Sequence, residues 1–321
     1  MFSNPLAITT SSLGLHPSHT LPEKIQAAAS ASFYAIEIAY QELEDYALSQ
    51  TPPRERLCSS ANITVLSLNP FKNFEGHNSP LEERLDRART WLNIAANLKT
   101  KYIQVPSQFD KEQSSGDWTR MVTDLQTLSA LAASYSVDIA YEAVAWGTYI
   151  DTWEDSLRMV QDVNRENFGL CLDAFHIAAR VWGDPTVESG MREDADLALA
   201  KSLDRFVETC PLDKVFYVQL SDGEKFVPPL QPGHRFYQED FPPSLCWSRN
   251  MRPLPLEEHL GAYLPVTDIA HAWLKRKEWK GVVSIEIFDW RMRDESRRPK
   301  ENVKRAVQSM EKLSAILERP E

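Results

Sequence analysis

The sequence is poor in the features that mark several large classes of protein. Its 321 residues include only four cysteines, which lie far apart and form no CxxC pair. That spacing argues against a zinc knuckle or a disulfide scaffold and fits a reducing compartment. Lysine and arginine number 35 against 46 aspartates and glutamates, which gives a formal net charge of −11. Because nucleic acids are bound by basic surfaces, this balance argues against a nucleic-acid partner.

Long apolar segments and targeting signals are also missing. No run approaches the roughly eighteen apolar residues that a membrane span requires. Met1–Leu13 lacks the basic start and the long apolar stretch of a secretory signal, and Glu318–Glu321 matches no anchor or organelle address. We therefore expect a cytoplasmic protein with no membrane partner.

The sequence does contain an alternation of short apolar runs and longer stretches of helical period. Hydrophobic residues make up 43% and charged residues 25%, enough to bury a sizeable core in one domain spanning residues 1–321. Eight runs are predicted as strands, and the stretches between them as helices. The strands are Leu6–Leu13, Ala35–Tyr40, Ile63–Phe71, Tyr102–Ser107, Asp138–Val144, Phe168–Phe175, Val215–Leu220 and Val282–Phe288. The helical patterns include Pro22–Ser32, Leu81–Leu98, Trp118–Tyr135 and Thr152–Asn164.

Repeated β/α units of this kind form either a closed barrel or an open sheet. Neither GxGxxG nor GxxxxGK[ST] follows the first strand, so a nucleotide-binding open sheet loses its usual support. We therefore predict an α/β fold, a (β/α)8 TIM barrel. Its main irregularity is Asp222–Pro265, a long loop between strands seven and eight that is rich in proline and aromatic residues. Loops of this length in compact domains are usually functional, and we expect a lid.

Polar residues near the ends of strands five to eight are the strongest functional signal. Each of these strands is otherwise apolar, and side chains alternate between its two faces. By this alternation Glu142, Asp173, Gln219 and Glu286 face the barrel axis near its carboxyl end, where the active sites of TIM barrels lie. Converging buried carboxylates would repel one another and lose hydration. A divalent cation would offset both the repulsion and the loss of hydration.

All four candidate ligands carry oxygen donors, which suits Mg²⁺, Mn²⁺ or Co²⁺ with positions left for water or substrate. The alternative is that these residues pair with arginine and lysine in buried salt bridges. A single acidic strand end fits that alternative better. Four such residues on consecutive strands favour one divalent metal ion.

Several ordered segments of the chain match one family. They are 141–148 (YEAVAWGT), 151–154 (DTWE), 171–178 (CLDAFHIA), 232–234 (PGH), 247–250 (WSRN), 261–266 (GAYLPV) and 284–288 (SIEIF). Through them the chain resembles the 3-dehydroshikimate dehydratases of the xylose-isomerase-like barrel superfamily, from Leu6 to about Phe288.

The resemblance implies a metal-dependent lyase that removes water from 3-dehydroshikimate to give protocatechuate, a reaction of quinate and shikimate catabolism. In that family a Glu, an Asp, a Gln and a Glu on successive strands hold the metal, and the matching positions here are Glu142, Asp173, Gln219 and Glu286. His176 lies three residues after Asp173, and we expect it to act as general base or acid. A lone histidine more often caps a helix or donates to a carbonyl, but the matched segment favours catalysis.

The expected substrate is a hydroxylated cyclic carboxylate, which needs a cation to bind it. Arg249 is the first choice, because a guanidinium grips a carboxylate bidentately. Ser248 would add a hydrogen bond, and Lys72, at the end of strand three, would add a second charge. Relatives often carry Arg or an aromatic residue at the position of Lys72.

Three further residues are expected near the mouth of the barrel. His234 in the long loop would close over the substrate ring, and Tyr149 would line the pocket where relatives often carry His. Glu37, at the end of strand two, points into the mouth by its alternation and is a second catalytic candidate. It would orient a histidine or arginine, or pair with Lys72. Lys72 and His234 fit the role of ordinary surface residues equally well.

A sugar or sugar-acid isomerase or epimerase is the main alternative function, since such enzymes place comparable ligands on the same barrel. A related metal-dependent nuclease would need several histidines at its site and a basic surface. Only one of the seven histidines is in a strand-end position, and the charge is −11, so both features oppose a nuclease. A sensor that binds a ligand without turnover is the third alternative. Barrels of this kind also suggest a homodimer.

Overall fold

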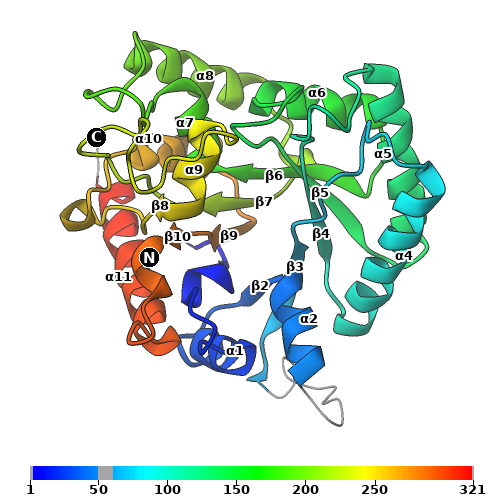
Figure 1. Ribbon diagram of the computed structural model, residues 1–321, viewed down its shortest axis with the longest axis horizontal. Coiled ribbons are helices and arrows are strands. Elements are labelled where there is room, and N and C mark those ends of the chain that lie inside the picture. The colour runs from blue at the N-terminus through cyan, green and yellow to red at the C-terminus, as the bar shows by residue number, and fades with distance from the viewer. Residues whose placement is uncertain (1–2, 50–60, 320–321) are drawn as a thin grey trace.

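Eight parallel strands close into a barrel with helices around it (Figure 1). The computed structural model describes residues 3–49 and 61–319. The barrel is closed because β1 pairs with both β2 and β9. The strands are β1 (Leu6–Thr9), β2 (Ala35–Ala39), β3 (Thr64–Asn69), β4 (Tyr102–Pro106), β5 (Asp138–Glu142), β6 (Phe168–Asp173), β7 (Val215–Leu220) and β9 (Val282–Ile285). This arrangement confirms the predicted (β/α)8 TIM barrel and all eight predicted strands.

Some strands end earlier than the apolar runs suggested, because side chains form hydrogen bonds with backbone groups that would otherwise continue the strand. At the end of β1, Thr9 Oγ1 accepts a 3.2 Å hydrogen bond from the backbone N–H of Ser12. Ser12 Oγ in turn donates to the carbonyl of Ile285, at 3.0 Å. Hydrogen bonds of this local type compete with the strand ladder and turn the chain. The run therefore leaves the sheet at Thr9 and not at Leu13.

Helices follow the strands and pack outside the barrel (Figure 1). The four predicted helical patterns are confirmed to within two residues at each end. The helices are α1 (Leu21–Ser30), α2 (Tyr40–Ser49), α4 (Leu81–Leu98), α5 (Trp118–Ala133), α6 (Trp153–Val163), α7 (Ala174–Val181), α8 (Ala195–Thr209), α9 (Pro243–Asn250), α10 (Val266–His271) and α11 (Pro299–Leu317). In the parts of the chain that the structure describes, no helix combines the length and apolar character needed to cross a membrane.

Aromatic side chains fill the interior of the barrel. Tyr102, the first residue of β4, stacks on Tyr217 of β7, with ring centroids 5.5 Å apart. Both rings are buried. Because the interior of a TIM barrel is a packed core and not a pore, we expect a ligand to bind at the face formed by the carboxyl ends of the strands.

The predicted long loop between β7 and β9 is partly regular structure. It contains α9 and the short strand β8 (Met251–Arg252). β8 pairs antiparallel with β10 (Phe288–Asp289), which follows β9, so the two form a ribbon outside the barrel. This β8–β10 ribbon brings a residue of the insertion, Arg252, opposite Phe288 and beside the end of the barrel.

Candidate active site

A cavity of about 240 Å³ opens at the carboxyl ends of the barrel strands. Residues from β3, β4, β5, α7, α9 and the β8–β10 ribbon line it. They include a group of charged and polar side chains, namely Lys72, Glu142, His176, Ser248, Arg249, Arg252 and Glu286. Gln104, Phe109, Trp146 and Phe288 form part of the remaining wall.

Three carboxylates converge beneath this cavity. Glu142 ends β5, Asp173 ends β6 and Glu286 follows β9, and their exposed fractions are 3%, 2% and 9%. Asp173 also accepts a 2.7 Å hydrogen bond from the backbone N–H of Phe175, which caps α7. This cap begins α7 directly at the strand end. It therefore places His176, in the first turn of α7, on the same rim.

His176 lies between two of the carboxylates. Its Nε2 is 3.8 Å from Glu142 Oε1 and 3.6 Å from Asp173 Oδ2. Its Nδ1 accepts a 3.1 Å hydrogen bond from the backbone N–H of Ala145. Burial lowers the pKa of His176 to about 4, so the ring is neutral at neutral pH. A neutral imidazole that accepts at Nδ1 carries its proton at Nε2, which makes His176 a hydrogen-bond donor toward the acidic cluster.

Arg252 of β8 is a functional residue that the sequence reasoning missed. Its side chain is buried, and its Nη2 donates to Asp173 Oδ2 at 2.5 Å. Its Nη1 donates to Glu286 Oε2 at 3.2 Å and to Ser248 Oγ at 3.3 Å. Ser248 and Arg252 are four residues apart, but Arg252 lies beyond the end of α9, in β8, so a helical spacing does not predict its position.

Glu37 does not take either of the roles expected from the sequence. It accepts hydrogen bonds from Tyr217, at 2.9 Å, and from Gln219 Nε2, at 3.0 Å. It also accepts from Ser284 Oγ, at 2.5 Å, and from Asn69 Nδ2, at 3.2 Å. The carboxylate is fully buried inside the barrel and is not among the residues that line the cavity. It therefore holds Gln219, and it neither orients His176 or an arginine nor pairs with Lys72.

Gln219 of β7 pairs in register with Asp173 of β6, so it lies beside the acidic cluster. Its Nε2 donates to Glu37 and also approaches Glu286 Oε1, at 3.3 Å. Its Oε1 accepts from the thiol of Cys171, at 3.4 Å. The amide thus turns its nitrogen toward the acids, and it needs a half-turn to present its oxygen to a cation.

The electrostatics of the cluster fit a divalent cation. Burial, together with the Glu286 and Asp173 carboxylates, raises the pKa of Glu142 well above its ordinary value. Burial raises the pKa of Glu286 to about 8, although Arg252 opposes this shift. Glu142 Oε1 is buried without a hydrogen-bond partner. One ligand atom from each of Glu142, Asp173 and His176 lies within 4.8 Å of the others. When all three carboxylates are ionised, the arginine beside them leaves two negative charges, which a divalent ion would balance.

The expected substrate-binding residues divide into two groups. Lys72, Ser248 and Arg249 line the cavity. Partial burial lowers the pKa of Lys72, and the charge of Arg249 adds to this effect, so the two cations lie near each other at the mouth.

Tyr149 and His234 are not among the residues that line the cavity. The hydroxyl of Tyr149 donates to the carbonyl of Ser114, at 3.1 Å. The ring of His234 packs against Phe226, with centroids 4.9 Å apart. The structure therefore places both residues in loop packing.

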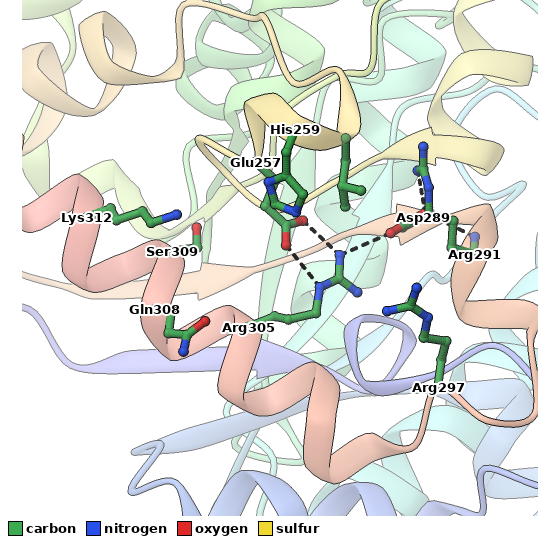
Figure 2. A pocket seen from close by; sticks show the side chains of 10 residues that line it. Glu257, His259, Asp289, Arg291, Arg297, Arg305, Gln308, Ser309 and Lys312 are labelled. Carbon is green, nitrogen blue, oxygen red and sulfur yellow. Dashed lines mark hydrogen bonds and ion pairs between the residues drawn. The ribbon is translucent and has the colours of Figure 1, made fainter.

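A second and larger cavity, of about 360 Å³, lies between α11 and the β8–β10 ribbon (Figure 2). Arg305 of α11 reaches into it and pairs with Glu257, at 2.8 Å, and with Asp289, at 3.1 Å. Arg291 pairs with Asp289 and with Glu224, both at 2.9 Å. Both arginines are engaged by carboxylates, of which Glu257 and Asp289 are buried, and the Arg305–Asp289 pair ties α11 to the ribbon. The cavity at the end of the barrel contains Glu142, whose Oε1 has no hydrogen-bond partner among the described residues, and it is therefore the candidate active site.

The fold and this site together define a class. Its members are (β/α)8-barrel proteins with a group of acidic side chains, at the carboxyl ends of their strands, that could hold a metal ion. Comparison with known proteins identifies the family within that class. Residues 25–313 match the xylose isomerase-like TIM barrel family, and the chain belongs to it.

Curated relatives of the chain are named as dehydratases. It is 35% identical to the 3-dehydroshikimate dehydratase of Neurospora crassa, over 98% of this chain and 95% of that protein. It is 30% identical to the 3-dehydroshikimate dehydratase of Pseudomonas aeruginosa, over 85% of this chain, and the match spans 37% of that longer protein.

Solved structures agree with the barrel fold. A xylose isomerase-like TIM barrel/4-hydroxyphenylpyruvate dioxygenase fusion protein superposes with a TM-score of 0.77 and 26% identity, over 98% of this chain and 43% of its own. The IOLI protein with a bound zinc atom superposes with a TM-score of 0.73 and 20% identity, over 98% of this chain and 99% of its own. The latter likeness shows the fold alone.

Proposed function

We propose that the chain is a metal-dependent 3-dehydroshikimate dehydratase, which removes water from 3-dehydroshikimate to give protocatechuate. The observation that carries this proposal is the match to the Neurospora crassa enzyme along nearly the whole length of both chains. The site supports it independently, because one cavity combines an acidic cluster for a cation with free cations for a carboxylate.

Glu142, Asp173, Gln219 and Glu286 would hold one divalent ion, Mg²⁺, Mn²⁺ or Co²⁺. The three carboxylates come from the ends of β5, β6 and β9, with Gln219 of β7 between the last two, and Glu142 Oε1 has no hydrogen-bond partner among the described residues. Gln219 would take part only after a half-turn of its amide, which gives up the present hydrogen bonds from its nitrogen to Glu37 and Glu286. Oxygen donors of this kind suit hard divalent ions. When bound, such an ion stabilises the negative charge that develops on a substrate oxygen as the neighbouring proton leaves.

The substrate carboxylate would bind at the mouth of the cavity. Among the residues that the structure describes, neither Lys72 nor Arg249 has an ion pair with a carboxylate, and both line the cavity. A carboxylate between them would relieve their mutual repulsion. Arg252 sits deeper, with Ser248 beside it. It is engaged with Asp173 and Glu286, so its first role is to balance the acidic cluster.

His176 would act at the reacting oxygens. Its Nε2–H faces the cavity beside Glu142 and Asp173. Dehydration removes a proton from the carbon next to the carbonyl and releases a hydroxyl from the ring, and the two leave together as water. A buried imidazole at this position would donate to the carbonyl or to the departing hydroxyl. Trp146 packs edge-on against the His176 ring, at 4.8 Å between centroids, and limits its movement.

An isomerase acting on a cyclic polyol is the second candidate. Over an alignment of 125 residues, which covers 36% of this chain and 44% of the relative, the chain is 31% identical to the inosose isomerase of Bacillus subtilis. The shorter match makes this the weaker candidate, although the same acidic cluster would serve it. A homodimer and a cytoplasmic location stay predictions, which light scattering and cell fractionation would test.

A direct assay separates the two candidates. The protein loaded with Mn²⁺, Mg²⁺ or Co²⁺ is given 3-dehydroshikimate or inosose in parallel, and ultraviolet absorbance follows the formation of an aromatic catechol. We expect a catechol from 3-dehydroshikimate and no isomerisation of inosose. Absence of catechol with every metal, from folded and metal-loaded protein, would contradict the proposal. Conversion of inosose under the same conditions would favour the isomerase.

A further inference from the structure

Gln104 is a buried polar residue inside the barrel with no assigned role. It lies in the middle of β4, pairs with Ala140 of β5 and is 3% exposed. Glu142 is two residues beyond Ala140 on the same face of β5, so the two side chains meet inside the barrel. Gln104 Nε2 donates a short hydrogen bond to Glu142 Oε2, and both residues line the active-site cavity.

The ionised form of Glu142, which is the form that binds a metal ion, fixes which way this amide faces. Gln104 Oε1 is buried and has no hydrogen-bond partner among the described residues, so its own contacts there do not set the orientation of the group. A half-turn would bring the amide oxygen against a carboxylate oxygen, which repels it, whereas the nitrogen donates to it. The contact therefore works in one direction, from the amide nitrogen to the carboxylate.

The same contact fixes how Glu142 presents its carboxylate. Oε2 is occupied by Gln104, and Oε1 is left without a partner on the side of His176 and Asp173. A carboxylate free of such a donor would rotate about its terminal bond and offer either oxygen. Residues that hydrogen-bond to a metal ligand from outside typically change metal affinity by about 10–100-fold.

We propose that Gln104 is a positioning residue that directs Glu142 Oε1 toward the metal position. The inference rests on the metal site of the proposed function, but it does not depend on the identity of the substrate. It assigns to β4 a part in a site whose ligands come from β5, β6, β7 and the end of β9.

The test is a titration of metal-stripped protein with Mn²⁺ by calorimetry, without substrate. Gln104→Met removes the donor at similar size, and Gln104→Asn keeps the amide but withdraws it by one methylene. Gln126→Met is the matched control, because Gln126 of α5 donates to the carbonyl of Val163, far from the site. We expect Mn²⁺ affinity to fall about 10–100-fold in both Gln104 variants and to stay unchanged in the control. Unchanged affinity in a folded Gln104→Asn or Gln104→Met protein would overturn the proposal.

The same Gln104 substitution in a Glu142→Asp protein shows whether Gln104 acts by positioning Glu142 or through a general effect on the structure. Glu142→Asp keeps the charge but moves the carboxylate away from Gln104. If Gln104 acts through Glu142, adding Gln104→Met to Glu142→Asp will cause little further loss of Mn²⁺ affinity. An equal loss in both backgrounds would show that Gln104 acts by another route. Wild-type protein that binds Mn²⁺ but yields no catechol would remove the substrate assignment alone, whereas wild-type protein that binds no Mn²⁺ would overturn this inference as well.

Discussion

Arg252 and Asp173 form a buried ion pair with 2.5 Å between Nη2 and Oδ2, and they come from two separate layers of the molecule. Asp173 belongs to the barrel, whereas Arg252 belongs to the ribbon that the insertion forms beside it. The pair therefore ties the insertion to the active site. It also supplies the one positive charge among three buried carboxylates.

Removing this charge should destabilise the metal-free protein. In Arg252→Met, Asp173 and Glu286 lose their buried partner, and breaking a pair of this kind costs about 3–5 kcal/mol. We expect the free energy of unfolding of metal-stripped protein, measured with urea, to fall by that amount. Adding Mn²⁺ should restore part of the loss, because the ion takes over the balancing charge. A variant as stable as the wild type without metal would contradict this role for Arg252.

Arg249→Met and Lys72→Met should weaken substrate binding more than they slow turnover. Each removes one charged hydrogen bond to the substrate carboxylate, which contributes about 1.5–3 kcal/mol, so KM should rise about tenfold to a hundredfold. Lys312→Met, in the second cavity of Figure 2, is the matched control and should leave KM unchanged. Steady-state kinetics of the three variants provide the test. A rise in KM of the same size in Lys312→Met would show a non-specific effect of charge.

Glu75 should make the stability of the protein depend on pH. This buried residue follows β3, and its Oε1 accepts from the backbone N–H of Gln108, at 2.7 Å, and from the hydroxyl of Tyr141, at 3.0 Å. Burial raises the pKa of Glu75 to about 7 from an ordinary value of 4.5. Between these two values the folded state holds a proton that the unfolded chain releases, so stability is lost as pH rises through this window.

The size of the effect follows from the difference between the two pKa values. Each whole step of pKa corresponds to about 1.4 kcal/mol, so the loss above pH 7 should reach roughly 3 kcal/mol. Glu75→Gln stays neutral and keeps both acceptor contacts. The free energy of unfolding of Glu75→Gln minus that of the wild type should therefore increase by that amount between pH 4.5 and pH 8. Parallel urea titrations at the two pH values measure it, and a constant difference would contradict the assignment.

The sequence was sufficient to predict the barrel and the acidic strand ends, because both depend on local alternation. Glu142, Asp173 and Glu286 were placed correctly at the end of the barrel by the period of two within their strands. Arg252 was out of reach of that argument. Its position depends on the pairing of β8 with β10, two short segments 36 residues apart at the register Arg252–Phe288.

Gln104 and Glu37 show a further limit of the sequence. Gln104 occupies an inward position in β4 that alternation could have identified, but a single polar residue in one strand does not reveal its partner on the next. For Glu37, alternation correctly predicted an inward side chain. It could not predict that four neutral donors from other strands would saturate the carboxylate.

The central claim is that the acidic cluster at the strand ends holds the metal ion on which dehydration depends. The most direct measurement is the rate of catechol formation from 3-dehydroshikimate by metal-stripped protein as Mn²⁺ is added, with bound metal determined in the same samples. We expect no product without metal and a rate that rises in proportion to occupancy up to about one ion per chain. Glu142→Gln should bind Mn²⁺ weakly and form no product at the same total concentration. A metal-stripped protein as active as the loaded one, or a fully active Glu142→Gln, would contradict the account.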